Sequence, residues 1–296
     1  MSDVIDLKAE MLEEENQASQ KQNSSSKLKV SILGDTDLAI AVKTLFNTNR
    51  AESSIFTSVD ESIAWTPNLT FICLPTRLLQ NDTLDDSDII NAIQKTIKQS
   101  TGGVCLKTAV SPDTITRIQS AIDAESFEKR FVYSPEVYDS EDVAAIINPK
   151  TILIGGLNPS ASAVIDVYRN YSNLVIENNK IQTCSPIEAA FVKLAISGFT
   201  AVRQTFFNQL YEVSSEYDDI NFTNVRRIFS SRDYSKEIST TLPTFIRSKD
   251  QEGLNNKMAK NHRGEYLNRD VKIFAALSDK TPLIDECVNY KNLKED

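Results

Sequence analysis

The sequence predicts an α/β protein: a parallel sheet with crossover helices, followed by an all-α region that contains one long helix. Two observations support this prediction. Between residues 28 and 156, short apolar runs rich in β-branched residues alternate with helical or polar stretches, which is typical of a parallel sheet. Beyond residue 156, one segment of about thirty residues keeps helical apolar spacing and has no interior proline.

The first 27 residues form a polar segment that ends in QKQNSSSK and contains no aromatic residue. Such a segment cannot bury enough apolar surface to fold alone, so we expect a flexible tail. Within it, LKAEMLEEEN could form a short helix that docks on a partner protein. The alternative is a tail that stays solvated.

Six short apolar runs are the predicted strands of the first domain, residues 28–156. Each is separated from the next by a helical or polar stretch. The runs are KLKVSILG, SSIFTSV, NLTFICLPT, GGVCLKTAV, RFVYSP and TILIGG. The first is followed directly by LAIAVKTLF, whose apolar spacing is helical, so the domain opens with strand, turn and helix.

Residues 157–296 are predicted to form a second, helical domain. Its long helix is SPIEAAFVKLAISGFTAVRQTFFNQLYEVSSEY. Residues 220–264 are polar and are expected to be irregular, and a helical pair follows at LNRDVKIFAAL and TPLIDECVNYKNL.

Composition and charge exclude several classes of function. The 296 residues carry a formal net charge of −9, and the 32 Lys and Arg residues form no dense run, which argues against nucleic-acid binding. No apolar run reaches the roughly 20 residues that span a bilayer, and the N-terminus lacks a signal-peptide core. The four cysteines have no CxxC spacing, and the one histidine, His262, has no partners at metal spacing. We therefore expect a protein of the cytoplasm or of an assembled particle, neither secreted nor membrane-bound, without a metal site.

Five motifs occur in a set order along the chain: FICLPT, LKTAVSPDT, FVYSPEVY, AAFVKLAISGFTAVRQTFFNQL and GEYLNRDV. They resemble, in the same order, the V-P-T-P, K-S-T-V-P-P-G-T, N-P-E-F-L, A-E-x-x-K-x-x-x-N and G-S-C-F-P-K-D motifs of the UDP-glucose and GDP-mannose dehydrogenase family. The resemblance covers nearly all of residues 28–290. The first three motifs lie at carboxyl ends of predicted strands, where an open α/β sheet binds its ligand. Thr76 and Thr108 in these motifs are candidate cofactor-binding residues.

The resemblance implies a Rossmann-like domain of the NAD-binding type, followed by a helical central domain. The family's further domain, which binds the nucleotide of the sugar substrate, is expected to be absent here. Members of the family oxidise a sugar C6 hydroxyl to a carboxylate with two NAD molecules, through a thiohemiacetal and a thioester on a cysteine. Their long helix packs against its twofold mate, which implies a homodimer or larger assembly through residues 189–215.

Several positions that match the family's catalytic residues are changed in type. The cysteine's position is Tyr266, and a phenol cannot replace a thiolate that both adds to an aldehyde and leaves. The asparagine four residues after Lys193 is Ser197, which is too short to reach the same point. Lys193, Asp270 and Glu136 keep their chemical type. No intact catalytic set is therefore expected at these five vestigial positions.

Each retained residue also has a purely structural interpretation. Lys193 and Asp270 are expected to form either an ion pair that joins the long helix to the closing helix or a vestigial pocket, and a further alternative is that Asp270 caps the helix DVKIFAAL. Glu136 is expected to shape a strand-end turn. The aromatic residues of the long helix suit either a twofold seam or the core of their own domain, and they are Phe199, Phe206, Phe207 and Tyr211.

The turn after the first strand is the expected dinucleotide site, but it departs from the G-x-G-x-x-G pattern. It reads GDTDLA, so its candidate contacts are Gly34, Thr36 and Ala39. The two aspartates flank the place of the pyrophosphate, where each like-charge contact would cost on the order of 1 kcal/mol. Asp60 is the candidate acid for the ribose, with helix capping as its alternative role. We expect no cofactor, or NAD if the ancestral site is retained.

The sequence thus predicts a dehydrogenase-like protein that is catalytically inactive and serves as a structural, assembly or interaction protein. Its drifted motifs would suit a fast-evolving gene, for instance a viral gene for a virion component. The alternative is an NAD-dependent nucleotide-sugar 6-dehydrogenase that acts on UDP-glucose. A third reading is a module that binds a nucleotide without turning it over.

Overall fold

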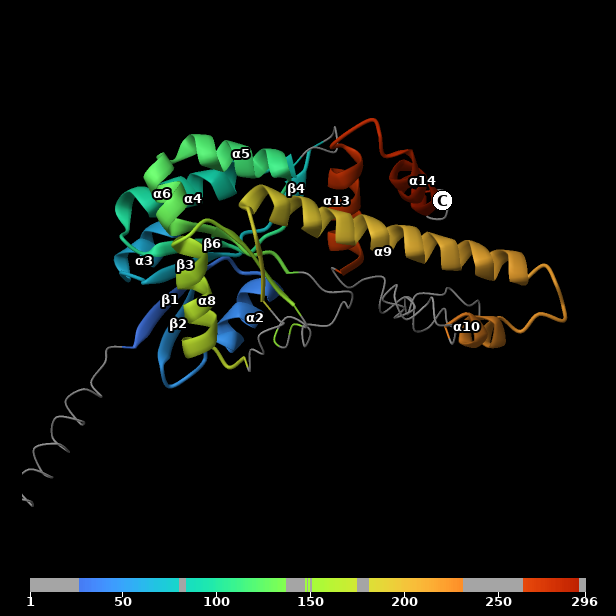
Figure 1. Cartoon of the computed structure of the whole chain (residues 1–296), viewed down its shortest axis with the longest axis horizontal. Helices are drawn as coiled ribbons and strands as arrows, with labels where there is room; N and C mark the ends of the chain where they lie inside the picture. Colours follow the sequence, from blue (N-terminus) through green and yellow to red (C-terminus); the bar gives the residue numbers. More distant parts are fainter. Residues whose placement is uncertain are drawn as a thin grey trace, which may run out of the picture.

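In a computed structural model of the chain, the structure describes residues 27–79, 84–136, 147, 149, 151–174, 181–230 and 263–292. Helices cover both faces of a central sheet, and a helical region extends away from one side of it (Figure 1). The predicted tail of residues 1–27 lies outside the described residues, apart from Lys27.

The central sheet has seven strands within the described residues, in the order β2-β1-β3-β6-β7-β8-β9. Neighbouring strands are parallel except β7 and β8, which pair antiparallel. The strands are β1 (Leu28–Leu33), β2 (Ala51–Phe56), β3 (Leu69–Ile72), β6 (Gly103–Leu106), β7 (Phe131–Tyr133), β8 (Ile152–Gly156) and β9 (Ile181–Cys184). A small antiparallel ribbon of β4 (Arg77–Leu78) and β5 (Leu84–Asp85) follows β3.

The central strands are buried on both faces, as the near-continuous apolar runs predict. Every residue of β3 and β7 is buried, and so are three of the four residues of β6. All six predicted strands are present. The predicted class, a Rossmann-like parallel sheet followed by helices, is therefore confirmed.

One face of the sheet is covered by α2 (Asp37–Leu45) and α8 (Ser160–Tyr171). Three rings fill the space between these helices and the strands. Phe46 lies 5.2 Å from Phe71 and 5.6 Å from Tyr168 between ring centroids. This face of the sheet is therefore closed by packed aromatic residues.

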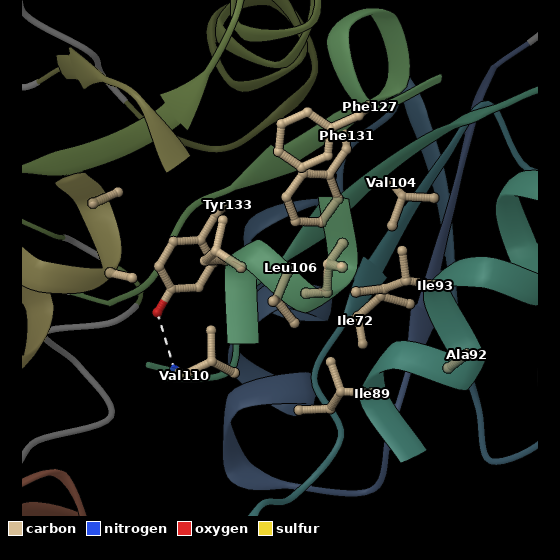
Figure 2. Packing of buried hydrophobic residues seen from close by; sticks show 14 of the residues in the cluster. Ile72, Ile89, Ala92, Ile93, Val104, Leu106, Val110, Phe127, Phe131 and Tyr133 are labelled. Atoms are coloured by element: carbon tan, nitrogen blue, oxygen red, sulfur yellow. Dashed lines mark hydrogen bonds between the residues drawn. The ribbon is translucent and has the colours of Figure 1, made fainter. Parts of the chain in front are cut away.

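The other face is covered by α4 (Ser87–Gln99), α5 (Pro112–Ala121), α6 (Ala124–Arg130) and the first part of a long helix, α9 (Pro186–Ser214). The short helix α3 (Val59–Ala64) lies beside α4. Figure 2 shows this core, in which Phe127 stacks on Phe131 at 5.2 Å between ring centroids.

The sheet continues past residue 156, the limit expected for the first domain. After β8 the chain forms α8 and then returns as β9, which pairs with β8. The sequence of β9, IQTC, is short and contains two exposed residues. It lacks the apolar run that predicts the other strands, so its pattern does not indicate a strand.

The helical region is built on α9, which spans 29 residues. A capping box starts it: Ser185 Oγ accepts the Glu188 N–H at 3.3 Å, and the Glu188 carboxylate accepts the Ser185 N–H at 2.8 Å. The first half of α9 packs on the sheet, α5, α13 (Arg263–Ala275) and α14 (Pro282–Asn292). Its far end extends away from the sheet (Figure 1).

The stretch expected to be irregular, residues 220–264, contains a helix, α10 (Phe222–Ser230). It packs against the far half of α9 through Phe229 on Phe207, 5.4 Å between centroids, and Phe222 on Tyr211, 5.2 Å. Apolar residues at 222, 225 and 229 share one helix face. The many polar residues around them make this short helical spacing difficult to recognise in the sequence. Within the described ranges, no helix combines the length and apolar content that crossing a membrane requires.

Candidate functional site

The candidate site lies where α9 and α13 meet the carboxyl ends of the parallel strands. Lys193 and Ser197 are four residues apart on α9 and therefore lie on one side of that helix. Asp270 comes from α13 and is only 2% exposed. The expected pairing of the long helix with the closing helix is thus present in the structure.

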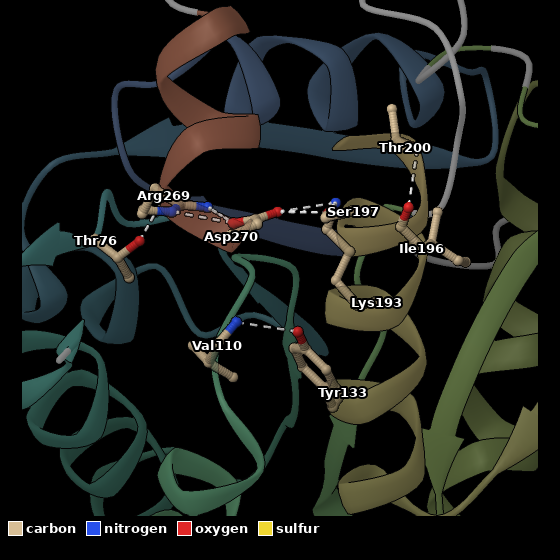
Figure 3. A network of polar contacts seen from close by, with 9 residues as sticks. All are labelled: Thr76, Val110, Tyr133, Lys193, Ile196, Ser197, Thr200, Arg269 and Asp270. Carbon is tan, nitrogen blue, oxygen red and sulfur yellow. Dashed lines mark hydrogen bonds and ion pairs between the residues drawn. The ribbon is translucent and has the colours of Figure 1, made fainter. Parts of the chain in front are cut away.

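Asp270 is the centre of a network of polar contacts (Figure 3). Its Oδ2 atom lies 3.1 Å from Lys193 Nζ and accepts the Ser197 hydroxyl at 3.2 Å. Its Oδ1 atom accepts hydrogen bonds from Arg269 Nη2 at 2.8 Å and Nε at 3.2 Å. Arg269 also donates from Nη1 to Thr76 Oγ1 at 2.6 Å. The network therefore ties α9 and α13 to the loop that follows β3.

The charges around Asp270 keep it ionised. Burial alone would raise its pKa, but the adjacent Lys193 and Arg269 cations and their hydrogen bonds outweigh burial, so the pKa lies below its usual value. Each oxygen of the carboxylate has a partner. Asp270 is thus a fixed anion at neutral pH and does not act as a proton donor.

Neighbouring hydroxyl groups bond to the backbone of the same strand ends. Thr108 donates to the Leu74 carbonyl oxygen at 2.7 Å. The Tyr133 hydroxyl accepts the Val110 N–H at 3.2 Å (Figure 3), and burial raises its pKa above the usual value. These groups stabilise the loops at the edge of the sheet.

Glu136 lies in a different cluster from Lys193 and Asp270. Its carboxylate is 2.5 Å from the Nζ atom of Lys107, a residue only 3% exposed. Lys107 Nζ also lies 3.4 Å from the Ser134 and Tyr168 hydroxyls. Since side chains alternate along β6, Lys107 lies on the same side of the sheet as Cys105, the side covered by α2 and α8.

The Lys107 cluster encloses almost no free space. A cavity of about 10 Å³ next to it holds at most one water molecule; its lining includes Lys107, Glu136 and Tyr168. Burial opposes the charge on Lys107, but the Glu136 carboxylate outweighs burial and raises the lysine pKa above its usual value. The sequence analysis did not identify Lys107 as a buried residue. The only signal for its burial is that this charged residue directly follows an apolar strand.

The turn after β1 is shaped by Gly34, whose φ is +137°. A Cβ atom there would lie 2.5 Å from the Cys73 carbonyl oxygen, so a side chain is excluded by both conformation and space. Thr36 is the N-cap of α2: its hydroxyl accepts the Ala39 N–H at 3.2 Å and donates to Cys73 O at 3.0 Å. Asp35 and Asp37 are exposed on either side of Thr36. One of the helix N–H groups that a phosphate would use is therefore bonded within the protein.

Asp60, the candidate for ribose binding, lies in the first turn of α3. Its side chain is 71% exposed and pairs with Lys95 of α4 at 2.7 Å. It does not cap the helix, since the N-cap is Ser58, which makes no side-chain capping bond. Its role in binding ribose stays a prediction.

Tyr266 lies in α13, four residues before Asp270. The structure describes its backbone only, and His262 lies outside the described residues.

The four cysteines lie away from the Asp270 network. Cys73 and Cys105 are buried in the sheet, and burial raises the pKa of Cys105 to about 12 and that of Cys73 further. Cys184 ends β9, with its pKa also raised by burial, and Cys287 is buried in α14. None of these thiols bonds to the Asp270 network.

The arrangement supplies a lysine, a carboxylate, a guanidinium and two hydroxyls, which can bind polar groups and hold a proton at Lys193. It has no ionised thiol to form a covalent intermediate. Over the part of the chain that the structure describes, no group of three or more His, Cys, Asp or Glu residues is placed to hold a metal ion.

Comparison with known proteins relates this geometry to dehydrogenases. No protein-family model matches the chain, and neither does any curated protein sequence. Solved structures do match. A UDP-glucose dehydrogenase from Pyrobaculum islandicum has a TM-score of 0.65 and 16% identity, over 90% of this chain and 69% of that one.

Two further structures widen the comparison. A GDP-mannose dehydrogenase from Pseudomonas aeruginosa matches with a TM-score of 0.56 and 13% identity, over 88% of this chain and 67% of that one. A Mycobacterium tuberculosis 3-hydroxyisobutyrate dehydrogenase matches with a TM-score of 0.66 and 12% identity, over 91% of this chain and 94% of that one. At such identities the likeness is one of fold: the chain has the fold shared by nucleotide-sugar and hydroxyacid dehydrogenases, with a Rossmann-like sheet followed by a long helix.

Proposed function

We propose that this chain is a nucleotide-sugar dehydrogenase-like protein that does not catalyse sugar oxidation and instead serves as a structural or assembly protein. The observation that carries the proposal is the network around Asp270. It contains a lysine and a carboxylate, and none of the four cysteines, all of which are described in the structure, bonds to it. Oxidation of an alcohol to a carboxylate through a thioester requires such a thiol.

The state of the available thiols supports the same conclusion. Cys73 and Cys105 are fully buried and have raised pKa values, so both are protonated at neutral pH. A protonated thiol inside a packed sheet is neither nucleophilic nor reachable by a sugar.

The turn after β1 is also unfavourable for a dinucleotide. The exposed Asp35 and Asp37 would stand beside a pyrophosphate, and Thr36 already caps the helix whose N-terminus would bind it. NAD would have to overcome two like-charge contacts, each of which costs on the order of 1 kcal/mol. The proposal therefore includes the loss of NAD binding.

The long helix is the element through which the protein would assemble. Several large apolar side chains on α9 are exposed, which is the property expected of a contact surface. They are Ile187, Phe191, Val192, Phe199, Phe206 and Val213.

A second candidate function is a simple NAD-dependent alcohol dehydrogenation. The match to 94% of the length of a 3-hydroxyisobutyrate dehydrogenase favours it, together with Lys193 at the strand ends. Hydride transfer from an alcohol needs a group that takes the proton but no thiol, so Lys193 would first have to lose the proton through which it pairs with Asp270. This function requires NAD to bind at the β1 turn.

The deciding experiment is calorimetric titration of the purified chain with NAD and NADH up to millimolar concentration. We expect no saturable heat, and a particle larger than a monomer by light scattering on the same sample. As a control, an Asp35→Ser/Asp37→Ser variant removes the two charges while keeping Thr36. A gain of binding in that variant would identify the aspartates as the cause.

The opposite outcome is equally clear. Saturable binding by the unchanged chain, followed by NADH production with UDP-glucose or L-serine, would overturn the non-catalytic proposal. The substrate that is turned over would then distinguish a nucleotide-sugar dehydrogenase from a simple alcohol dehydrogenase.

A further inference from the structure

The central sheet has an open edge at β2 (Ala51–Phe56), the first strand in the sheet order. Its strand neighbour is β1, which runs parallel to it. The helices α2 and α3 both contact β2, but they lie on opposite faces of the sheet and do not cover its edge. Within the described ranges, no strand lies beyond β2.

The hydrogen bonds to β1 show which backbone groups of β2 point outward. In a parallel pair, the N–H and C=O of one residue point to one neighbour, and those of the next residue point the other way. The Phe56 carbonyl oxygen accepts the Gly34 N–H at 2.9 Å, so the even-numbered residues of β2 face β1. Ser53 and Ile55 therefore direct both backbone groups away from the sheet.

The edge lacks the features by which proteins usually block strand pairing, which are lysine, proline and bulges on the edge strand. β2 reads AESSIF, so its single charged residue is Glu52. All six residues pair with β1 in continuous register, without a bulge. One outward group is already used, because the Ala51 N–H donates to Thr48 Oγ1 at 3.0 Å. The outward groups of Ser53 and Ile55 form a template for a further strand.

We propose that two copies of this chain pair edge to edge through β2, with the strands antiparallel and Ser54 of each copy on the twofold axis. The inference rests on the proposed assembly role and deepens it. It names a second copy as the partner and a contact surface that does not include α9.

In this register, Ser53 of one copy lies opposite Ile55 of the other. Both residues have outward groups, so each such pair exchanges two N–H···O=C bonds. The twofold axis generates two pairs, because a twofold interface brings the same surface of each copy together. The dimer therefore has four interchain hydrogen bonds, and the occupied N–H of Ala51 is not needed for any of them.

The charge of Glu52 selects this register. With Ser54 on the axis, the two Glu52 residues are four positions apart along the paired strands, roughly 14 Å, which exceeds the Debye length of about 8 Å. With Ser53 on the axis that distance falls to roughly 8 Å, and with Glu52 on the axis the two carboxylates face each other. Moving the axis past Ser54 leaves fewer outward residues of β2 paired. A chain with a net charge of −9 favours the register that separates the carboxylates.

Pairing also gives new neighbours to the apolar end of β2. Ile55 and Phe56 are only partly buried in the single chain. In the paired sheet, Ile55 lies beside Ser53 of the second copy, and Phe56 lies beside the stem of Glu52 of the second copy. Side chains directly opposite on adjacent strands are close enough to pack, so the contact covers apolar surface as well as backbone.

Disulfide trapping of the full chain tests the register. A Ser54→Cys chain is oxidised in a Cys184→Ser background, which removes the partly exposed native thiol. Ser54 would occupy a non-hydrogen-bonded pair, where the Cα atoms lie about 4.5 Å apart and within reach of a disulfide. We expect a covalent dimer. Thr57→Cys is the matched control: this exposed position directly follows β2, and its two copies would lie about 20 Å apart.

A second measurement removes backbone hydrogen bonds. Ser53→Pro deletes the outward N–H of Ser53 and keeps the N–H groups that bond to β1. Two of the four interchain bonds are lost, one from each copy, so sedimentation equilibrium should show a dimer at least tenfold weaker. Ser53→Ala keeps the N–H and should leave the dimer unchanged. Equal association of the two variants would overturn the proposal, and the crosslink decides the question if Ser53→Pro does not fold.

The outcomes separate this inference from the proposed function. An oligomer that forms equally well with Ser53→Pro, or that crosslinks as readily through Thr57→Cys as through Ser54→Cys, overturns the β2 contact and leaves the assembly role intact. A monomer at all concentrations overturns both. NAD turnover by a chain that forms the expected Ser54→Cys crosslink overturns only the non-catalytic role.

Discussion

Asp270 is the buried charge at the contact between α9 and α13. It is 2% exposed and is bonded by a lysine, an arginine and a serine at once. Removing one partner from a buried ion pair is more costly than exchanging the whole pair, because the remaining charges stay buried without compensation. The cost of changing Asp270 should therefore be large.

We predict that Asp270→Asn destabilises the fold by about 3 kcal/mol at pH 7, measured by urea denaturation. Asp60→Asn is the control, since that carboxylate pairs with Lys95 but is 71% exposed, and it should cost less than about 1 kcal/mol. Equal costs for the two variants would contradict the central position of Asp270.

Comparison of the unchanged chain with Asp270→Asn also gives a prediction for the pH dependence of stability. The folded-state pKa of Asp270 lies below its unfolded value, so its carboxylate stabilises the fold above the unfolded pKa of about 3.9. This stabilisation is lost as the pH falls through the folded-state pKa. The stability difference between the unchanged chain and Asp270→Asn should be constant above about pH 5 and shrink below it. A difference that grows on acidification would contradict this assignment.

Gly34 offers a second prediction at the scale of one residue. Gly34→Ala would place a Cβ atom 2.5 Å from a carbonyl oxygen at a φ of +137°. We expect a loss of about 1–3 kcal/mol, the usual cost of a strained backbone. Gly103→Ala is the matched control, because its nearest neighbour is a Leu69 methyl group at 3.2 Å and its φ is not positive. Thermal unfolding of both variants gives the comparison, and a smaller loss for Gly34→Ala would contradict it.

At the scale of elements, the start of α9 depends on its capping box. Ser185→Ala removes the side chain that bonds the Glu188 N–H, and we expect a loss of about 1 kcal/mol. Ser58→Ala is the control, since Ser58 occupies the N-cap of α3 without a side-chain bond. Chemical denaturation should show almost no change for the control. An equal effect in both would mean that the box does not stabilise α9.

Much of the element order could be predicted from periodicity. Runs such as NLTFICLPT are apolar because their strands are covered on both faces, and the long helix keeps its apolar spacing for 29 residues. β9 and α10 were not predicted. β9 has no apolar run, and α10 is held by aromatic contacts with α9 that only the folded chain brings together.

The candidate site could be predicted only in part. The resemblance to the dehydrogenase family singled out Lys193 and Asp270, as an ion pair or as a vestigial pocket, and their atoms do lie 3.1 Å apart. It also grouped Glu136 with them, although Glu136 pairs with Lys107. Which side of the sheet a residue occupies after a strand depends on a one-residue register. A motif match does not specify that register.

At the scale of the whole molecule, net charge should set the salt dependence of association. Two copies that each carry −9 repel one another, whereas the exposed side chains of α9, such as Phe199 and Phe206, are apolar. Raising sodium chloride from about 0.05 to 0.5 M shortens the Debye length and should strengthen the proposed assembly through α9, as measured by sedimentation equilibrium. Weakening by salt would point to an interface held by ion pairs.

The bond between Arg269 and Thr76 joins residues that are 193 positions apart in the chain. During synthesis from the N-terminus, the strands of the sheet and all of α9 emerge before α13 does. Until then, Lys193 has no carboxylate opposite it, and the loop after β3 lacks the donor to Thr76. The arrival of Arg269 and Asp270 thus adds the polar link between α9 and the loop after β3 to a sheet on which α9 can already pack. A ribosome paused before α13 would hold a chain that lacks this link.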